Sequence, residues 1–158
     1  MSHYSRARTR KFLYQMLYAS TFSEVENESF KESFFSWVFN SELDETYLND
    51  MYNLILENQS FLIQVVGKYA PKFDIENMDV SSIIPIFIGV TEMILFPEEI
   101  PAKVSINEAV EISKVYWDDS ARKMVNWVLN KVLNDLENLK IELQHFDRES
   151  SHKILFKK

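Results

Sequence analysis

Cysteine is absent from this chain of 158 residues, and glycine (2) and proline (4) are scarce. Without cysteine there is no disulfide scaffold, no thiol catalysis and no metal site with cysteine ligands. The shortage of glycine and proline leaves little material for tight turns, which barrels and sandwiches of short strands need in number. An all-β fold is therefore nearly excluded.

Long apolar runs are also missing. The longest, over residues 83–96, is interrupted by Pro85, Thr91 and Glu92 and is too short and too polar to span a bilayer. The basic residues near the start are not followed by the apolar stretch and cleavage site of a signal peptide. We therefore expect a cytoplasmic protein that does not enter a membrane.

The residues that are present favour a helical globular protein. Hydrophobic residues make up 46% of the chain and include 12 Phe, enough for a sizeable core. Apolar residues recur with a period near 3.6, so we expect an all-α fold. We expect a single domain over residues 1–144 and a frayed tail over 145–158. The predicted helices cover residues 4–22, 28–40, 44–57, 59–70, 82–96, about 105–117 and 120–144.

Two of these helices carry a specific expectation. Pro85 is compatible with the helix over 82–96 only if it lies in the first turn. In the helix over 4–22, we place Arg6, Arg10 and Gln15 on the flank that the apolar stripe leaves exposed.

Charge is distributed unevenly along the chain. The net charge is -7, which argues against a general nucleic-acid binder. Residues 1–23, however, carry four basic residues and no acid, whereas residues 24–57 carry nine acids and one lysine. The basic tip on this acidic body is either a polyanion-binding site or a solvated helix end. Its four cations are Arg6, Arg8, Arg10 and Lys11.

Signatures of catalysis are weak. The three histidines lie near the ends of the sequence, far from any spacing typical of metal ligands, and no phosphate-binding loop or nucleophile elbow occurs. The pair Glu98–Glu99 suits a surface loop, and Asp118–Asp119 suits the dipole at the start of the next helix. We therefore expect no enzyme, no metal and no cofactor.

The most distinctive segment covers residues 100–133. It reads IPAKVSINEAVEISKVYWDDSARKMVNWVLNKVL, which predicts a loop followed by two amphipathic helices. Asn107 and Asn126 lie close to the two apolar stripes. Each is either a capping or solvent-facing residue, or part of a hydrogen bond that fixes the angle between the helices.

Several motifs carry a family resemblance. They are IP-x-KV-x-INEAVE-x-x-K over residues 100–114, S-x-x-K-x-VN-x-VL over 120–129, and R-x-R-x-R-K-x-x-x-Q-x-LY over 6–18. A looser match, I-x-x-x-EM over 88–93, is similar to a family pattern I-x-x-YEL. Together they resemble the NusB family of bacterial transcription antitermination factors over about residues 4–136.

The resemblance implies a compact bundle of about seven helices in two packed helical subdomains. It also implies a non-enzymatic protein that binds boxA-type single-stranded RNA of ribosomal RNA leaders. The implied partners are NusE, a small-subunit ribosomal protein, and the RNA polymerase antitermination complex. The alternative is a protein–protein interaction module of the same fold, possibly homodimeric, that has lost or weakened RNA binding. Phe87, Met124 and Trp127 depart from the family pattern and favour that alternative.

The resemblance also assigns site residues. Tyr18 is as compatible with the core as with RNA, and Glu92, which matches the glutamate of the family's YEL, is either a partner contact or a solvated residue. Trp127 replaces a family glycine and could stack on a base or pack between helices; we expect the second. The residues expected to contact RNA are Arg6, Arg8, Arg10, Lys11, Gln15, Tyr18, Met124 and Asn126, and the residue expected to contact the protein partner is Glu92.

Overall fold

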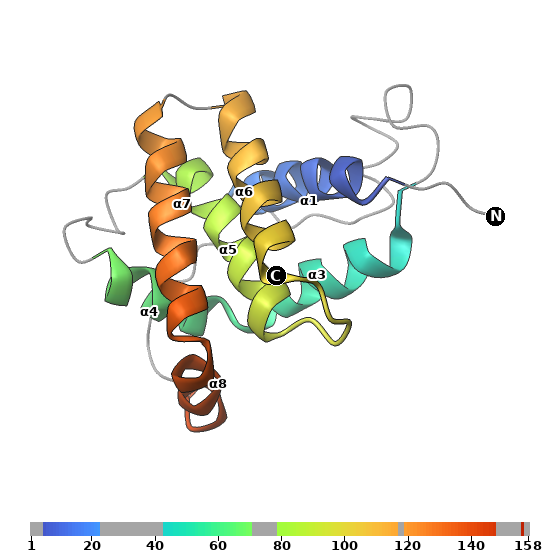
Figure 1. The fold of residues 1–158 in the computed structure, drawn as a ribbon. Coiled ribbons are helices and arrows are strands. Elements are labelled where there is room, and N and C mark those ends of the chain that lie inside the picture. The colour runs from blue at the N-terminus through green and yellow to red at the C-terminus, as the bar shows by residue number, and fades with distance from the viewer. Residues whose placement is uncertain (1–4, 23–42, 71–78, 117–118, 148–155, 157–158) are drawn as a thin grey trace.

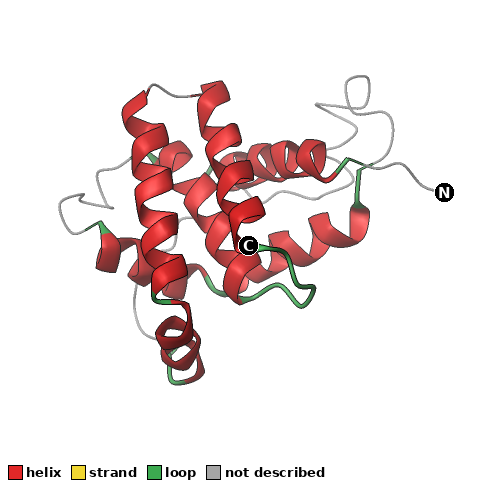
Figure 2. Ribbon diagram, viewed as in Figure 1, coloured by secondary structure: helices red, strands yellow, loops and turns green. Residues whose placement is uncertain are grey.

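The computed structural model describes residues 5–22, 43–70, 79–116, 119–147 and 156. These ranges contain helices and loops but no strand (Figure 2), which confirms the predicted all-α fold. The helix predicted over 28–40 lies outside the described residues. The helices are α1 (Arg6–Ser20), α3 (Glu45–Glu57), α4 (Gln59–Tyr69), α5 (Val80–Ile94), α6 (Ala102–Tyr116), α7 (Asp119–Asn134) and α8 (Leu136–Gln144).

Helix α5 lies at the centre of the described structure. It packs against each of the other described helices, with α6 and α7 side by side against it and α1 and α3 running across it on the other side (Figure 1). Its residues from Ile83 to Glu92 are all buried, because neighbours surround it on every side. No helix in the described ranges is long and apolar enough to cross a membrane.

Pro85 lies inside α5, beyond its first turn, so the predicted restriction of this proline to the first turn was wrong. Proline has no N–H, and the carbonyl of Ser81, four residues earlier, therefore lacks its usual helical donor. The hydroxyl of Tyr14 donates to that carbonyl oxygen at 3.1 Å. A side chain of α1 thus replaces the backbone bond that Pro85 removes.

Close contact between α5 and α7 depends on Gly89. A Cβ placed on this residue would lie 2.8 Å from Cδ1 of Leu129, whose side chain is fully buried. That distance is shorter than an ordinary contact, so only glycine lets the two helices approach this closely without a shift of Leu129.

The single helix predicted over 120–144 is instead two helices, α7 and α8, which meet at Asp135. The backbone of Asp135 has φ -116° and ψ 20°, outside the helical range. Its carboxylate accepts hydrogen bonds from the hydroxyl of Tyr69 at 2.5 Å and from Nζ of Lys68 at 3.3 Å, both near the end of α4. Contacts with α4 therefore fix the corner, and no glycine or proline marks it in the sequence.

Candidate nucleic-acid interface

Helix α1 presents one exposed stripe to solvent. The helix begins after Ser5, whose hydroxyl oxygen accepts a hydrogen bond from the backbone N–H of Arg8 at 3.1 Å. Its apolar side is fully buried, which leaves the opposite side facing outward. We call the outward residues the α1 stripe; they are Arg8, Lys11, Gln15 and Tyr18, at intervals of three or four residues.

The α1 stripe changes chemistry along its length. Arg8 and Lys11 are exposed cations in the first half, Gln15 is half-buried, and Tyr18 is 39% exposed. Phe22, 65% exposed, continues the stripe by one turn and meets Tyr18 edge to face, with ring centroids 5.4 Å apart. Cations for phosphates and flat rings for bases are the groups that hold single-stranded RNA.

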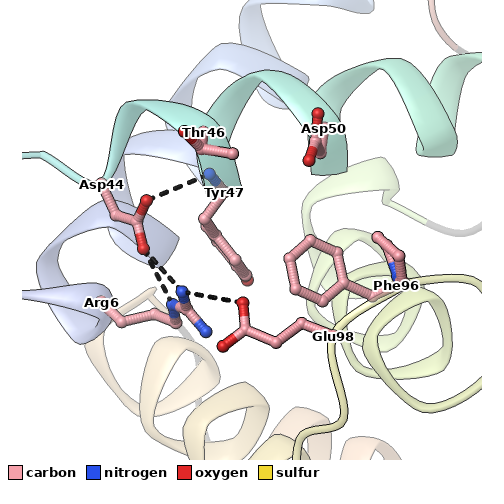
Figure 3. A pocket seen from close by; sticks show the side chains of 8 residues that line it. Arg6, Asp44, Thr46, Tyr47, Asp50, Phe96 and Glu98 are labelled. Atoms are coloured by element: carbon pink, nitrogen blue, oxygen red, sulfur yellow. Dashed lines mark hydrogen bonds and ion pairs between the residues drawn. The ribbon is translucent and has the colours of Figure 1, made fainter.

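Arg6 lies apart from the α1 stripe, beside a cleft between α1, α3 and the loop after α5 (Figure 3). Its guanidinium is 2.6 Å from Oδ2 of Asp44 and 3.5 Å from Oε2 of Glu98, and it lies over the ring of Tyr47 at 4.8 Å. Burial alone would lower the pKa of Arg6, but Asp44 and Glu98 raise it. Arg6 is thus a neutralised cation, although its side chain is still 27% exposed.

Arg10 is buried, so its predicted place on an exposed flank was wrong. The residue is 3% exposed, and its Nε and Nη2 donate to the two carboxylate oxygens of Glu92 at 2.7 and 3.0 Å. Glu108 lies 3.8 Å from Nη1 on the other side. Burial acts to lower the pKa of Arg10, but the hydrogen bonds and charge of Glu92 raise it.

Glu92 is likewise interior, at 3% exposed, and is neither a solvated residue nor a surface contact in this structure. Besides the two bonds from Arg10, its carboxylate accepts hydrogen bonds from the hydroxyls of Tyr47 and of Ser105, the latter at 2.9 Å. This Arg10–Glu92 network joins α1, α3, α5 and α6. Reversing the charge of Glu92 would place two cations together in the interior, so the isolated protein is not expected to stay folded.

The two α7 residues expected to contact RNA, Met124 and Asn126, lie in different surroundings. Met124 is 9% exposed and belongs to the core, not to a surface. Asn126 is exposed and accepts hydrogen bonds from Nδ2 of Asn130, at 2.8 Å to its carbonyl and 3.1 Å to its side chain. Both bonds lie within α7, and Asn107 is exposed as well, so the two asparagines face solvent.

Trp127 is 55% exposed, and the expectation that it packs between helices was wrong. Nζ of Lys131, one turn later, lies 4.4 Å from the centre of its ring. The spacing Trp–x–x–x–Lys is the one signal in the sequence that could have indicated this exposed cation–π pair. Phe22 was missed in the same way, although it lies four residues after Tyr18.

Further ion pairs lie within α6 and α7. Lys114 donates to Glu111 at 2.7 Å, and this bond, together with the charges of Lys11 and Arg122, lowers the pKa of Glu111. Arg122 itself pairs with Asp119 within α7, at 2.5 Å. Within the described residues, no group of three His, Asp or Glu side chains is placed to hold a metal ion.

The family model and the similar proteins found by comparison all carry the name NusB. The family model described as NusB matches residues 7–134. The transcription antitermination protein NusB of Clostridium perfringens is 30% identical in an alignment of 138 residues that covers 84% of this chain and 99% of the relative. Its counterpart from Bacillus subtilis is 26% identical over 133 residues, 84% of this chain and 97% of that one.

A solved structure of NusB from T. maritima shares the fold. It superposes with a TM-score of 0.69 at 24% sequence identity and covers 85% of this chain and 94% of that one. The family match covers most of the sequence, and the described helices agree with the fold of that structure. This chain therefore belongs to the NusB family.

Proposed function

We propose that the chain is a transcription antitermination factor without enzymatic activity, which binds boxA-type single-stranded RNA of ribosomal RNA leaders together with NusE. The relatives that it matches over most of its length carry the name transcription antitermination protein. The observation that supports the RNA-binding role most directly is the α1 stripe, where two exposed cations lead to an exposed aromatic ring on one face of one helix.

Within this proposal the residues divide by their surroundings. Arg8 and Lys11 contact phosphates, Tyr18 stacks on a base, and Gln15 lies between them on the same face. Asn126, which is exposed on α7, adds a polar contact to RNA from that helix. Arg10, Glu92 and Met124 act by holding the helices in place, because each is buried.

NusE and the antitermination complex remain the proposed protein partners. Arg6 and Arg10 are each paired to carboxylates. Of the four cations of α1, only Arg8 and Lys11 are exposed to solvent and form no ion pair with a described carboxylate. Such a surface has a small electrostatic attraction for RNA by itself. A second protein that adds contacts would raise the affinity, so we propose that RNA binding depends on NusE.

The neutralised arginines also favour a second candidate function. A chain of this family that lost RNA binding would act as a protein–protein module, with exposed apolar side chains such as Trp127 and Ile141 available for contact with another protein or a second copy.

Titration of a fluorescent boxA-type RNA from the organism's own ribosomal leader distinguishes the two functions. The RNA-binding proposal predicts binding that tightens when NusE is added and weakens with a scrambled RNA of the same composition. Failure to bind either RNA at low salt, with and without NusE, would contradict it and favour the protein–protein module.

A further inference from the structure

Phe156 is the described residue nearest the end of the sequence, and it is fully buried. Its ring packs edge to face on Phe87 of α5, with centroids 5.9 Å apart. Most of the tail predicted over 145–158 lies outside the described residues; of the described ones, Phe146 also packs its ring on Phe61, with centroids 5.4 Å apart. Phe156 therefore reaches the centre of the fold, because α5 is its central helix.

The backbone of Phe156 is held as firmly as its ring. The side-chain oxygen of Gln59 accepts the N–H of Phe156 at 3.0 Å, and Nε2 of Gln59 donates to the carbonyl of Phe156 at 3.3 Å. One side-chain amide thus pairs with both polar groups of a single residue, as a neighbouring strand would. Gln59 is itself 4% exposed and is fixed by a further bond to the carbonyl of Leu56 at 3.2 Å.

These contacts have the two properties of a peptide-recognition site. Hydrogen bonds to the main chain hold an extended segment irrespective of its sequence, and an apolar pocket selects one side chain. Here Gln59 supplies the hydrogen bonds to the main chain, and the ring of Phe87 forms part of the apolar pocket. We call Gln59 and Phe87 the Phe156 socket. Phe156 lies 22 positions beyond the last residue that the family model matches, so the family match does not account for it.

We propose that the Phe156 socket is a binding site for an aromatic residue of an extended peptide segment, and that the chain's own Phe156 occupies it intramolecularly. The inference is separate from the proposed RNA-binding role, because it concerns the α4–α5 side of the molecule and is tested without RNA. Tethering gives the segment an effective concentration in the millimolar range, so the intramolecular form excludes free peptides that bind more weakly.

The first test compares Phe156→Ala with Ile141→Ala in the full chain. Ile141 is 54% exposed, so its substitution removes an apolar side chain without emptying a buried position. We expect Phe156→Ala to lower the Tm by roughly 5–15 °C and Ile141→Ala to leave it within about 2 °C. Equal Tm values for the two variants would overturn the proposal, since Phe156 would then not be anchored.

The second test asks whether the socket accepts a segment supplied separately. A fluorescent peptide with the sequence of residues 151–158, SHKILFKK, is titrated into the full-length Phe156→Ala variant, with a control peptide that has Ala at the Phe position. We expect the Phe peptide to bind at least about tenfold more tightly than the Ala peptide. Wild-type protein, whose socket is filled, should not bind either peptide at micromolar concentration.

Two further measurements define what would overturn the proposal. Adding Gln59→Met to the Phe156→Ala variant keeps the side-chain length but removes the amide, and it should weaken binding of the Phe peptide about tenfold. Equal affinities for the Phe and Ala peptides would show that Phe156 is an ordinary core residue. A wild-type dimer that becomes monomeric with Phe156→Ala would show exchange between copies and contradict the intramolecular assignment.

Discussion

The arginines of α1 alternate in the sequence, and their surroundings differ accordingly. Successive helical residues are about 100° apart, so Arg6 and Arg10 share one side while Arg8 points roughly to the opposite side. The sequence is sufficient to group Arg6 with Arg10. It does not reveal that their side faces Asp44 and Glu92, because both carboxylates come from distant parts of the chain.

This difference predicts a large loss of stability for one arginine substitution and almost none for the other. Arg10→Ala leaves Glu92 charged and unpaired in the interior and should lower the free energy of unfolding by about 3–5 kcal/mol. Arg8→Ala changes an exposed side chain and should stay within about 0.5 kcal/mol of wild type. Urea unfolding followed by circular dichroism measures both. Similar losses for the two variants would contradict the buried ion pair.

The exposed side chain of Trp127 should contribute little to the stability of the fold. Because more than half of its side chain is in solvent, Trp127→Ala should cost no more than about 1 kcal/mol. Leu129→Ala, two residues later in the fully buried stripe, should cost about 2–5 kcal/mol. The same urea measurement compares them, and a Trp127 loss as large as that of Leu129 would place the indole in the core.

Tyr47 makes the stability sensitive to alkaline pH. Burial and the charge of Glu92 raise the pKa of Tyr47 well above its usual value, and burial together with Asp135 raises the pKa of Tyr69 to about 12. Above pH 10 the tyrosines of the unfolded chain lose protons while these two in the native state keep theirs, so the free energy of unfolding falls as pH rises.

Substituting Tyr47 tests that pH dependence. Tyr47→Phe loses a hydrogen bond to Glu92 at every pH, but it should decline less steeply than wild type between pH 10 and 11.5. Unfolding by urea at several pH values gives the slope. An unchanged slope would show that Tyr47 ionises equally easily in the folded and unfolded chains.

At the scale of helices, period and capping residues predict most of the described structure. The predicted helix over 44–57 is observed as Glu45–Glu57, and its N-cap Asp44 accepts from the N–H of Tyr47 at 3.1 Å, as its type favours. The misses have tertiary causes. Contacts with α4 fix the corner at Asp135, and a side chain of α1 compensates for Pro85 in α5.

The compensation at Pro85 can be measured with a double-mutant cycle. Tyr14→Phe removes the donor to the carbonyl of Ser81 and should cost about 1–2 kcal/mol. In a Pro85→Ala background the new N–H can bond that carbonyl within the helix, so the same change should cost about 1 kcal/mol less. Equal costs in both backgrounds would show that the Tyr14 hydroxyl does not replace the missing bond.

In the molecule as a whole, the buried polar groups hold the helices together, whereas the exposed ones of the α1 stripe are available for binding. The Arg10–Glu92 network ties α1 to α3, α5 and α6, and it thereby fixes the direction in which the α1 stripe faces. The sequence could indicate the stripe, since Arg8, Lys11 and Tyr18 follow helical spacing. It could not separate the surface cations from the buried ones, because that depends on where the carboxylates of other helices lie.

In the proposed function, the α1 stripe binds RNA phosphates through Arg8 and Lys11. The most direct test measures RNA affinity against salt concentration for Arg8→Ala/Lys11→Ala, with Lys103→Ala/Lys140→Ala as a control that removes two exposed cations elsewhere. We predict that the first variant loses affinity and that its log–log salt slope falls by roughly 1.4, about 0.7 for each phosphate contact, while the control keeps the wild-type slope. Equal slopes for wild type and the Arg8/Lys11 variant would contradict the claim.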